Sequence, residues 1–398
     1  MNNSAKHHRS SGFFSRILKQ TFSGWGAKIG LAWIAILVFT AVFSPFLANS
    51  MPLLVSLKGQ LSSPVIKYLN VEDIVVIIAF FILLVMFLSP LRHSLKTLFF
   101  FFLIMIVGVT IVSKQFVVEQ QNIVYESFRN DLKTTQYDWV VMPPIPYAPQ
   151  DYLRDVRAQP LEAPLANKKH THLMGTEENG GDVFSRMIHA SRIALGIGFI
   201  ATGIAMVIGV ILGGLMGYFS GIVDMLGMRL VEIFEAIPTL FLLLTFVAFF
   251  GRSIYIMMVI IGLTSWSGYA RYIRAEFLRL RKQDFVQATI ASGLPLRSIL
   301  FRHMLPNGIA PLLVATSFGV ASAILAEATL SFLGLGLVGA PSWGQMLNQA
   351  VQSSTFNWWM AVFPGGAIFL TVFAYNLMGE ALRDAIDPQM AKKAGVAG

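Results

Sequence analysis

The amino-acid sequence predicts an all-α transmembrane protein, a polytopic helical bundle with about eight membrane spans. Of the 398 residues, 55% are hydrophobic and only 13% are charged, whereas about 25% of the residues of a soluble domain are charged. Apolar stretches of roughly 20 residues, the length that crosses a bilayer core, recur along the chain. These observations exclude a soluble globular enzyme. The chain has no cysteine, which also excludes a disulfide framework, a thiolate nucleophile and metal sites built on sulfur.

Eight stretches are long and apolar enough to be predicted as spans. Two acidic residues fall within them, Glu235 near the end of a segment and Glu327 well inside another. An acidic side chain is costly at both places, which makes each a candidate for a special role. In chain order the predicted spans are Ile29–Asn49, Ile74–Leu91, Thr97–Ser113, Ile193–Val223, Ile233–Gly251, Ser253–Ala270, Gly308–Leu337 and Asn357–Met378.

The basic residues predict that both termini are cytoplasmic. The net charge is +9, and Lys and Arg are enriched in the short cytoplasmic loops of membrane proteins. With the termini inside, the basic cluster between Arg271 and Arg302 and the turn with Arg229 also lie inside. The opposite orientation would carry that cluster across the membrane, which the charge bias disfavours.

The N-terminal half begins with a basic cytoplasmic head, residues 1–28. Its apolar side chains between Phe13 and Trp25 recur at helical spacing, which predicts a short helix in the membrane interface; the alternative is a disordered basic tail. The first span, 29–49, is longer than the apolar region of a cleavable signal peptide, so we expect an uncleaved anchor.

Between the first span and the C-terminal half, the sequence predicts three segments. The last of them is rich in proline, which breaks helices, so it should be mostly extended and irregular. Its length favours a function-bearing external loop, with a poorly ordered linker as the alternative. The three segments are an external loop at 50–72, an extra transmembrane hairpin at 73–113 and an external Pro-rich loop at 114–192.

The C-terminal half is predicted to be a five-span core, residues 193–380, followed by a cytoplasmic tail, 381–398. Its cytoplasmic loop, 271–307, has the pattern of two short helices broken at Gly293. A glycine there can end the first helix in the left-handed conformation, and Pro295 can begin the second. The result would be a compact knob suited to a groove in a partner, or else a solvated basic loop that serves only topology.

The loop carries a pattern that resembles the EAA signature of the membrane subunits of bacterial ABC importers. The matching residues are Gln287-Ala288-Thr289, Gly293 and Leu305-Pro306-Asn307. In that family this loop is the coupling helix seated on the ATPase. Gln287 stands where Glu is usual, and Thr289 where the second Ala is usual. The resemblance implies ATPase coupling through Gln287, Ala288, Thr289, Ser292, Gly293, Leu305 and Pro306.

Three further motifs are similar to the C-type permeases for dipeptides, oligopeptides and nickel. They are Gly175-Thr176-Glu177 with 180–186 (GGDVFSR), 330–336 (LSFLGLG) with 341–344 (PSWG), and 382–388 (LRDAIDP). The family-signature residues in the first motif are Gly175, Thr176, Glu177, Gly180, Asp182 and Arg186.

The resemblance also implies the type I ABC importer permease fold for the C-terminal half. Gly181, where Arg is usual, and residues 48–55 resemble the Yej-type subgroup associated with microcin C and oligopeptide uptake. Family members have six spans, so the hairpin at 73–113 is an addition.

We expect this chain to have no catalytic activity and to bind no ATP itself. It has no G-x-x-x-x-G-K-[ST] run to hold ATP phosphates, and no Ser/His/Asp arrangement, so we predict neither an enzyme nor catalytic residues. His170 and His172 lie near Glu177, but two histidines in a polar loop predict no metal site. Glu327 is predicted either to line a translocation pathway or to be a neutral acid hydrogen-bonded to a neighbouring helix.

The resemblance therefore implies a membrane permease subunit that moves peptides or peptide-like compounds across the bacterial cytoplasmic membrane. Its partners would be a second permease subunit, two ATPase subunits that hold ATP and Mg²⁺, an extracytoplasmic substrate-binding protein and the lipid bilayer, with no nucleic acid and no cofactor on this chain. The alternative is a membrane scaffold or regulatory protein that keeps the permease fold without transporting.

Overall fold

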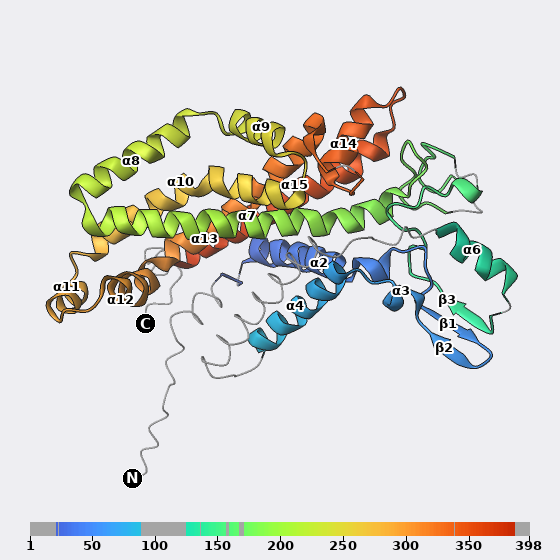
Figure 1. Ribbon diagram of the computed structural model, residues 1–398, viewed down its shortest axis with the longest axis horizontal. Helices are drawn as coiled ribbons and strands as arrows, with labels where there is room; N and C mark the ends of the chain where they lie inside the picture. Colours follow the sequence, from blue (N-terminus) through green and yellow to red (C-terminus); the bar gives the residue numbers. More distant parts are fainter. Residues whose placement is uncertain are drawn as a thin grey trace, which may run out of the picture. The chain divides into compact units, whose positions relative to one another are not determined.

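The computed structural model describes residues 21–22, 24–88, 125–135, 137–156, 159–166, 171–337 and 339–386. The chain, drawn as a ribbon in Figure 1, forms two compact units. We call the first the helical unit and the second the mixed unit. The helical unit takes Met1–Ile36, Ala194–Leu337 and Gly366–Gly398, and the mixed unit takes Leu37–Ile193 and Val338–Gly365.

Three long helices contribute to both units: α2 (Trp25–Leu47), α7 (Val183–Phe219) and α15 (Trp358–Ile386). The other elements of the helical unit follow one another from the end of α7. They are α8 (Gly221–Ala236), α9 (Thr239–Phe250), α10 (Ile254–Leu280), α11 (Asp284–Ala291), α12 (Leu296–Ser298), the π-helix η2 (Ile299–Met304), α13 (Leu305–Leu330) and the π-helix η3 (Ser331–Leu335).

Close packing of α7 on α10 depends on glycines spaced one turn apart on α7. Gly209, Gly213 and Gly217 all face the α10 backbone. A Cβ on Gly217 would lie 2.6 Å from the Cβ of Phe277, and a Cβ on Gly213 would overlap the carbonyl oxygen of Ala270. Small residues at this spacing let membrane helices approach backbone to backbone. Figure 1 shows α7 and α10 side by side.

The mixed unit combines a small sheet with short helices. The three-stranded antiparallel sheet has the order β2-β1-β3, with Val55 opposite both Ser62 and Val140. In addition to parts of the three long helices, the mixed unit contains β1 (Leu54–Leu57), β2 (Gln60–Ser62), α3 (Pro64–Lys67), α4 (Val71–Leu88), α6 (Tyr125–Thr134), β3 (Trp139–Val141), the 3-10 helix η1 (Arg154–Val156) and α14 (Trp343–Gln352).

The predicted count of eight spans is not confirmed. In the part of the chain that the structure describes, four helical stretches are long and apolar enough to cross a membrane, and the count becomes five when the bent pair α8 and α9 is taken as one span. The predicted span Thr97–Ser113 lies outside the described residues. The four stretches are Trp25–Leu47, Val183–Phe219, Leu296–Leu335 and Trp358–Ile386.

The predicted span Ile233–Gly251 is wrong as a single helix. The chain breaks between α8 and α9, which are bent by 83° relative to each other. Pro238 has no N–H to donate and disfavours helical geometry in the residue before it, and Ile237 has extended backbone angles. The turn predicted around Arg229 is also wrong, because Arg229 lies within α8.

Several predicted boundaries move because helices run on beyond their apolar segments. The helix α10 continues to Leu280, so the first ten residues of the predicted loop 271–307 are helical. The helix α7 begins at Val183, ten residues before the predicted span, so it takes the end of the loop predicted at 114–192. The loop predicted at 50–72 contains β1, β2 and α3.

The predictions at the two ends fall largely outside the described residues. Most of the basic head, including its interfacial helix, lies there, and so does the hairpin beyond Leu88. The helix α15 extends through Ile386, past the predicted end of the core, and the rest of the predicted tail lies outside the described residues.

Candidate functional site

The segment between α10 and α13 forms a knob, which we define as residues 281–304. Its helix α11 is anchored by Val286, which is fully buried. Val286 belongs to one apolar core with Phe277 and Leu280 of α10 and with Leu300 and Met304 of η2. The knob is therefore tied to the ends of the two helices that it joins, α10 and α13.

A Schellman motif ends α11 at Gly293. The Gly293 N–H donates to the Ile290 carbonyl at 2.9 Å, and the Leu294 N–H donates to the Thr289 carbonyl at 3.3 Å. Gly293 has a φ of +71°, a conformation that glycine adopts without the cost borne by other residues. This geometry agrees with the left-handed conformation predicted from the sequence.

The other residues predicted in the knob hold its backbone or lie on its surface. The Thr289 and Ser292 hydroxyls donate to the carbonyls of Val286 and Ala288, respectively, at 2.7 and 2.8 Å. The Gln287 side-chain amide donates to the Arg281 carbonyl at 2.6 Å. Leu305 and Pro306 begin α13 at the far side of the knob.

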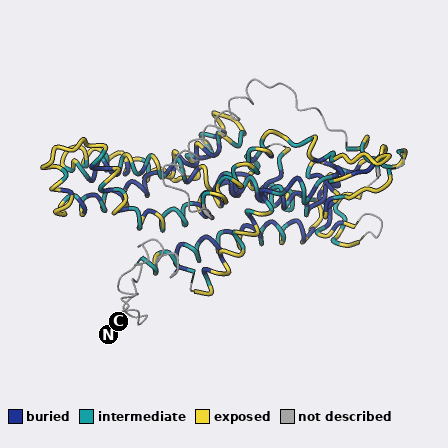
Figure 2. The backbone as a smooth tube through the Cα atoms, turned by 90° about the horizontal axis from the view of Figure 1, so that it is seen from below, coloured by how far each residue is buried: buried dark blue, intermediate teal, exposed yellow. Residues whose placement is uncertain are grey.

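The surface of the knob exposes several large apolar side chains. Figure 2 shows the exposed backbone of this loop in yellow at the left end of the view. Exposed apolar groups gathered on one surface are typical of a protein interface. The large apolar side chains exposed there are Phe285, Ile290, Leu294, Leu296 and Phe301.

A cavity of about 260 Å³ lies among α7, α10 and α13. Its lining, taken from the described residues, is uncharged and consists of small residues, aromatic rings, hydroxyl groups and the aliphatic Ile261. Gly319 of α13 makes room for Tyr269, because a Cβ on this glycine would overlap the tyrosine hydroxyl. The sequence analysis missed this cavity. The polar residues of the lining are Thr202, Ser265, Tyr269, Tyr272 and Ser322.

Glu327 lies on α13 but is not among the described residues that line this cavity. Its side chain is buried, with 3% of the residue exposed. One carboxyl oxygen, Oε1, accepts a hydrogen bond of 2.6 Å from the hydroxyl of Ser331, one turn later in the same helical run. This hydrogen bond lies within one helical run, and both roles predicted for Glu327 stay predictions.

The signature residues of the first motif lie together in the mixed unit, where they build the start of α7. The Asp182 carboxylate accepts the Ser185 N–H at 2.7 Å, which is the geometry of a helix N-cap. The Thr176 hydroxyl donates to the Gln159 carbonyl at 2.9 Å and accepts the Glu162 N–H at 2.8 Å. These contacts give the motif a structural role.

The remaining signature residues complete the same turn. Gly175 has a φ of +78°, and a Cβ there would lie 2.6 Å from the Glu162 carbonyl oxygen. Gly180 also has a positive φ, +85°. Glu177 is buried and accepts the Asn179 N–H at 3.2 Å, and Arg186 donates to the Pro149 carbonyl at 3.2 Å. The two glycines and two charged residues fix the backbone that leads into α7.

The structure describes only one of the two histidines that were considered as metal ligands, His170 and His172. His170 lies outside the described residues. His172 is buried, its Nδ1 lies 2.8 Å from Asp182 Oδ1, and its ring lies 4.5 Å from the ring of Tyr147. Among the described residues, no group of three or more His, Asp or Glu side chains is placed to hold a metal ion.

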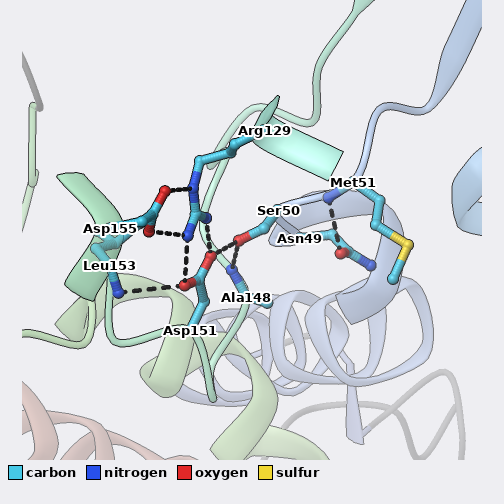
Figure 3. A network of polar contacts seen from close by, with 8 residues as sticks. All are labelled: Asn49, Ser50, Met51, Arg129, Ala148, Asp151, Leu153 and Asp155. Atoms are coloured by element: carbon cyan, nitrogen blue, oxygen red, sulfur yellow. Dashed lines mark hydrogen bonds and ion pairs between the residues drawn. The ribbon is translucent and has the colours of Figure 1, made fainter. Parts of the chain in front are cut away.

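The mixed unit also contains a polar network that the sequence analysis missed (Figure 3). Arg129 of α6 joins Asp151 and Asp155, and its Nε donates to Asp155 Oδ2 at 2.8 Å. The Ser50 hydroxyl donates to Asp151 at 2.5 Å and accepts the Ala148 N–H at 2.8 Å. The hydrogen bonds from Arg129 hold the pKa of Asp155 below its usual value.

Comparisons with known proteins point to one family. Residues 209–392 match the model of the binding-protein-dependent transport system inner membrane component. The dipeptide transport system permease protein DppC of Alkalihalophilus pseudofirmus is 37% identical over 58% of this chain and 75% of its own length. The oligopeptide transport system permease protein OppC of Haemophilus influenzae is 37% identical over 55% of this chain and 70% of its own length.

One further relative and one solved structure are also similar to this chain. The di/tripeptide transport system permease protein DppC of Pseudomonas aeruginosa is 37% identical over 63% of this chain and 82% of its own length. A solved structure of the MetNI methionine ABC transporter in inward-facing conformations aligns with 50% of this chain and 96% of its own, at 18% identity and a TM-score of 0.39.

Proposed function

The chain belongs to the family of binding-protein-dependent transport system inner membrane components, and from this premise we propose that it is the permease subunit of a bacterial ATP-driven importer. Its cargo is a peptide or a peptide-like compound, the class named in the similar permeases reported above. The knob is the observation that supports a coupled transporter. It exposes apolar side chains on a firmly anchored loop, as docking on an ATPase requires.

The coupling role rests on the way the knob is held. Val286 and the Schellman motif at Gly293 fix α11 between α10 and α13. A push on the knob is therefore delivered to two helices that line the cavity. That cavity, with its hydroxyl groups and no charge among its described lining, suits an uncharged part of a peptide and serves as one wall of the pathway.

The proposal includes the partners and the placement in the membrane. A second permease subunit completes the pathway, two ATPase subunits hold ATP and Mg²⁺, and an extracytoplasmic binding protein delivers the cargo. The chain lies in the bacterial cytoplasmic membrane with both termini inside. It contributes no ATPase site of its own, in keeping with its lack of a phosphate-binding loop.

The test is peptide uptake by vesicles that contain the assembled complex. We expect uptake to require this chain, and a double change in the knob, Ile290→Ser with Leu294→Ser, to abolish both uptake and copurification of the ATPases. The matched control is Phe356→Ser in the mixed unit, where an apolar side chain is 86% exposed. Undiminished uptake in a strain that lacks the chain would favour the scaffold alternative.

A further inference from the structure

The helix α8 is tied to α10 at both of its ends by ion pairs. Asp224, in the first turn of α8, pairs with Arg274 through two hydrogen bonds, one of them 2.6 Å between Nη2 and Oδ2. Glu235, in the last turn, pairs with Arg271. The two arginines lie three residues apart on α10, so the pairs fix the position of α8 along that helix.

The start of α8 is also tied to the knob through Arg281. The Arg281 side chain donates to the Ser220 hydroxyl at 2.6 Å, and the Arg281 carbonyl accepts the amide of Gln287. Ser220 and Gly221 form the turn between α7 and α8, with φ angles of +51° and +57°. One residue thus contacts both the knob helix and the turn from which α8 begins. Figure 1 shows these segments at the same end of the helical unit.

The far end of α8 meets the bend at Pro238. Glu235 lies three residues before this proline, and α9 departs at an angle of 83°. Between its ends α8 is an unbroken helix, Val231 is fully buried, and Gly227 lies against Met216 so closely that a Cβ would overlap its side chain. A shift of the start of α8 therefore moves the bend as well.

Stability alone does not account for the Glu235–Arg271 pair. The Arg271 and Glu235 side chains are 51% and 32% exposed, and pairs of that exposure contribute at most about 1 kcal/mol. Charged side chains within an otherwise apolar membrane protein are costly and usually mark function. These pairs do supply a fixed connection between helices, whatever their net contribution to folding.

We propose that Arg281, the Asp224–Arg274 pair and the Glu235–Arg271 pair form a relay through α8. This relay presupposes the transport function proposed above. The relay transmits displacement of the knob to the bend at Pro238, and so to α9. Its members are positioning residues: they contact no cargo and carry no chemistry.

The first experiment measures peptide uptake per ATP hydrolysed by the assembled complex. We expect Asp224→Asn with Glu235→Gln to lower this ratio about 5-fold or more, the range of a typical coupling energy, while the ATPases still copurify and hydrolyse ATP. The exchanged pair Asp224→Arg with Arg274→Asp should recover part of the ratio. The matched control is Arg229→Gln with Glu232→Gln, because this exposed pair lies within α8 and joins it to no other helix.

The second experiment follows α9 directly and needs no cargo. Since the chain has no cysteine, a Thr245→Cys reporter on the exposed face of α9 can be labelled with a maleimide. We expect its labelling rate to change when ATP is trapped in the complex, and this change to vanish with Asp224→Asn and Glu235→Gln. If ATP alters labelling equally with and without the two ion pairs, the relay is refuted. If ATP has no effect in the reporter complex that keeps both ion pairs, the coupling role proposed for the knob fails, and with it the relay.

Discussion

In the helical unit, glycines of α7 bring two backbones into contact, whereas in the mixed unit a partly buried arginine holds two aspartates together. The contact at Gly213 depends on the absence of a side chain. The network around Arg129 depends on matched charges and hydrogen bonds between segments far apart in the sequence. The contact at Gly213 should therefore be sensitive to added volume, and the network around Arg129 to loss of charge and to pH.

The largest effect is expected from Gly213→Val. Its side chain would overlap the backbone of Ala270, and a backbone cannot rotate away as a side chain can. We expect a loss of more than about 3 kcal/mol, seen as a fall of about 6–12 °C in the unfolding temperature in detergent. The control is Gly203→Ala on the same helix, where a Cβ meets nothing within 4 Å. Equal effects of the two changes would show that helix packing at Gly213 is not tight.

Next in size is Arg129→Met, which leaves Asp151 and Asp155 close together without their shared cation. The arginine side chain is 17% exposed, so we expect a loss of about 2–4 kcal/mol, somewhat less than for a fully buried pair. Limited proteolysis of the mixed unit measures it. Lys133→Met removes a positive charge from the exposed side of the same helix and should change the cleavage rate little. Cleavage confined to the helical unit would contradict the prediction.

The structural features that depend on local sequence patterns could be predicted from the sequence. The apolar runs indicated long helices, and a glycine between two short periodic segments indicated the turn at Gly293, which has the expected positive φ. The type I permease assignment came from motifs in the C-terminal half, and the relatives bear it out. Each of these signals lies within a few neighbouring residues.

Long-range pairings were not predictable in the same way. Arg129 meets partners 22 and 26 residues away, and the strand β1 pairs with β3 more than 80 residues later. Neither pairing leaves a periodic trace in the sequence. Pro238 itself was a visible signal for the bend. The residues on both sides of it are apolar, however, and their hydropathy led to the prediction of one continuous span. The glycines of α7 were read only as part of an apolar run, although their four-residue spacing was visible.

A smaller effect is expected from pH, through Asp155 in the mixed unit. Hydrogen bonds from Arg129 lower the pKa of Asp155 in the folded state, whereas an unfolded aspartate titrates near about 3.9. The ionised carboxylate therefore stabilises the fold above the unfolded pKa, and this contribution is lost as the pH falls through the lower, folded value. We expect the unfolding temperature to change little from pH 7 to 5 and to fall below about pH 4.

The variant Asp155→Asn identifies the group responsible for that pH dependence. It cannot ionise, so it should start less stable at pH 7 and lose less between pH 5 and pH 3 than the wild type does. A matched change is Asp138→Asn, because the N–H of Gly59 and the hydroxyl of Ser56 lower the pKa of that exposed carboxylate without an arginine. If all three proteins lose the same amount below pH 4, the network around Arg129 is not the source.

The smallest effect on stability is expected at the knob. Gly293 is needed there for its backbone conformation, whereas Gln287 contributes a side-chain hydrogen bond. A Cβ on Gly293 meets nothing within 4 Å, so its only cost is the φ of +71°, about 1 kcal/mol or more for a residue with a side chain and worst for a β-branched one. Gly293→Val should misdirect α12 and abolish uptake with normal membrane levels of the protein. Gly293→Asn should retain part of the uptake, because asparagine tolerates this conformation better.

Gln287→Glu restores the usual family residue but removes the amide donor to the Arg281 carbonyl. Because this contact is exposed, we expect uptake and stability within about 0.5–1 kcal/mol of wild type. A Gly293→Val protein that keeps its ATPases and its uptake would show that the knob can be redirected without consequence, and that coupling passes through another surface.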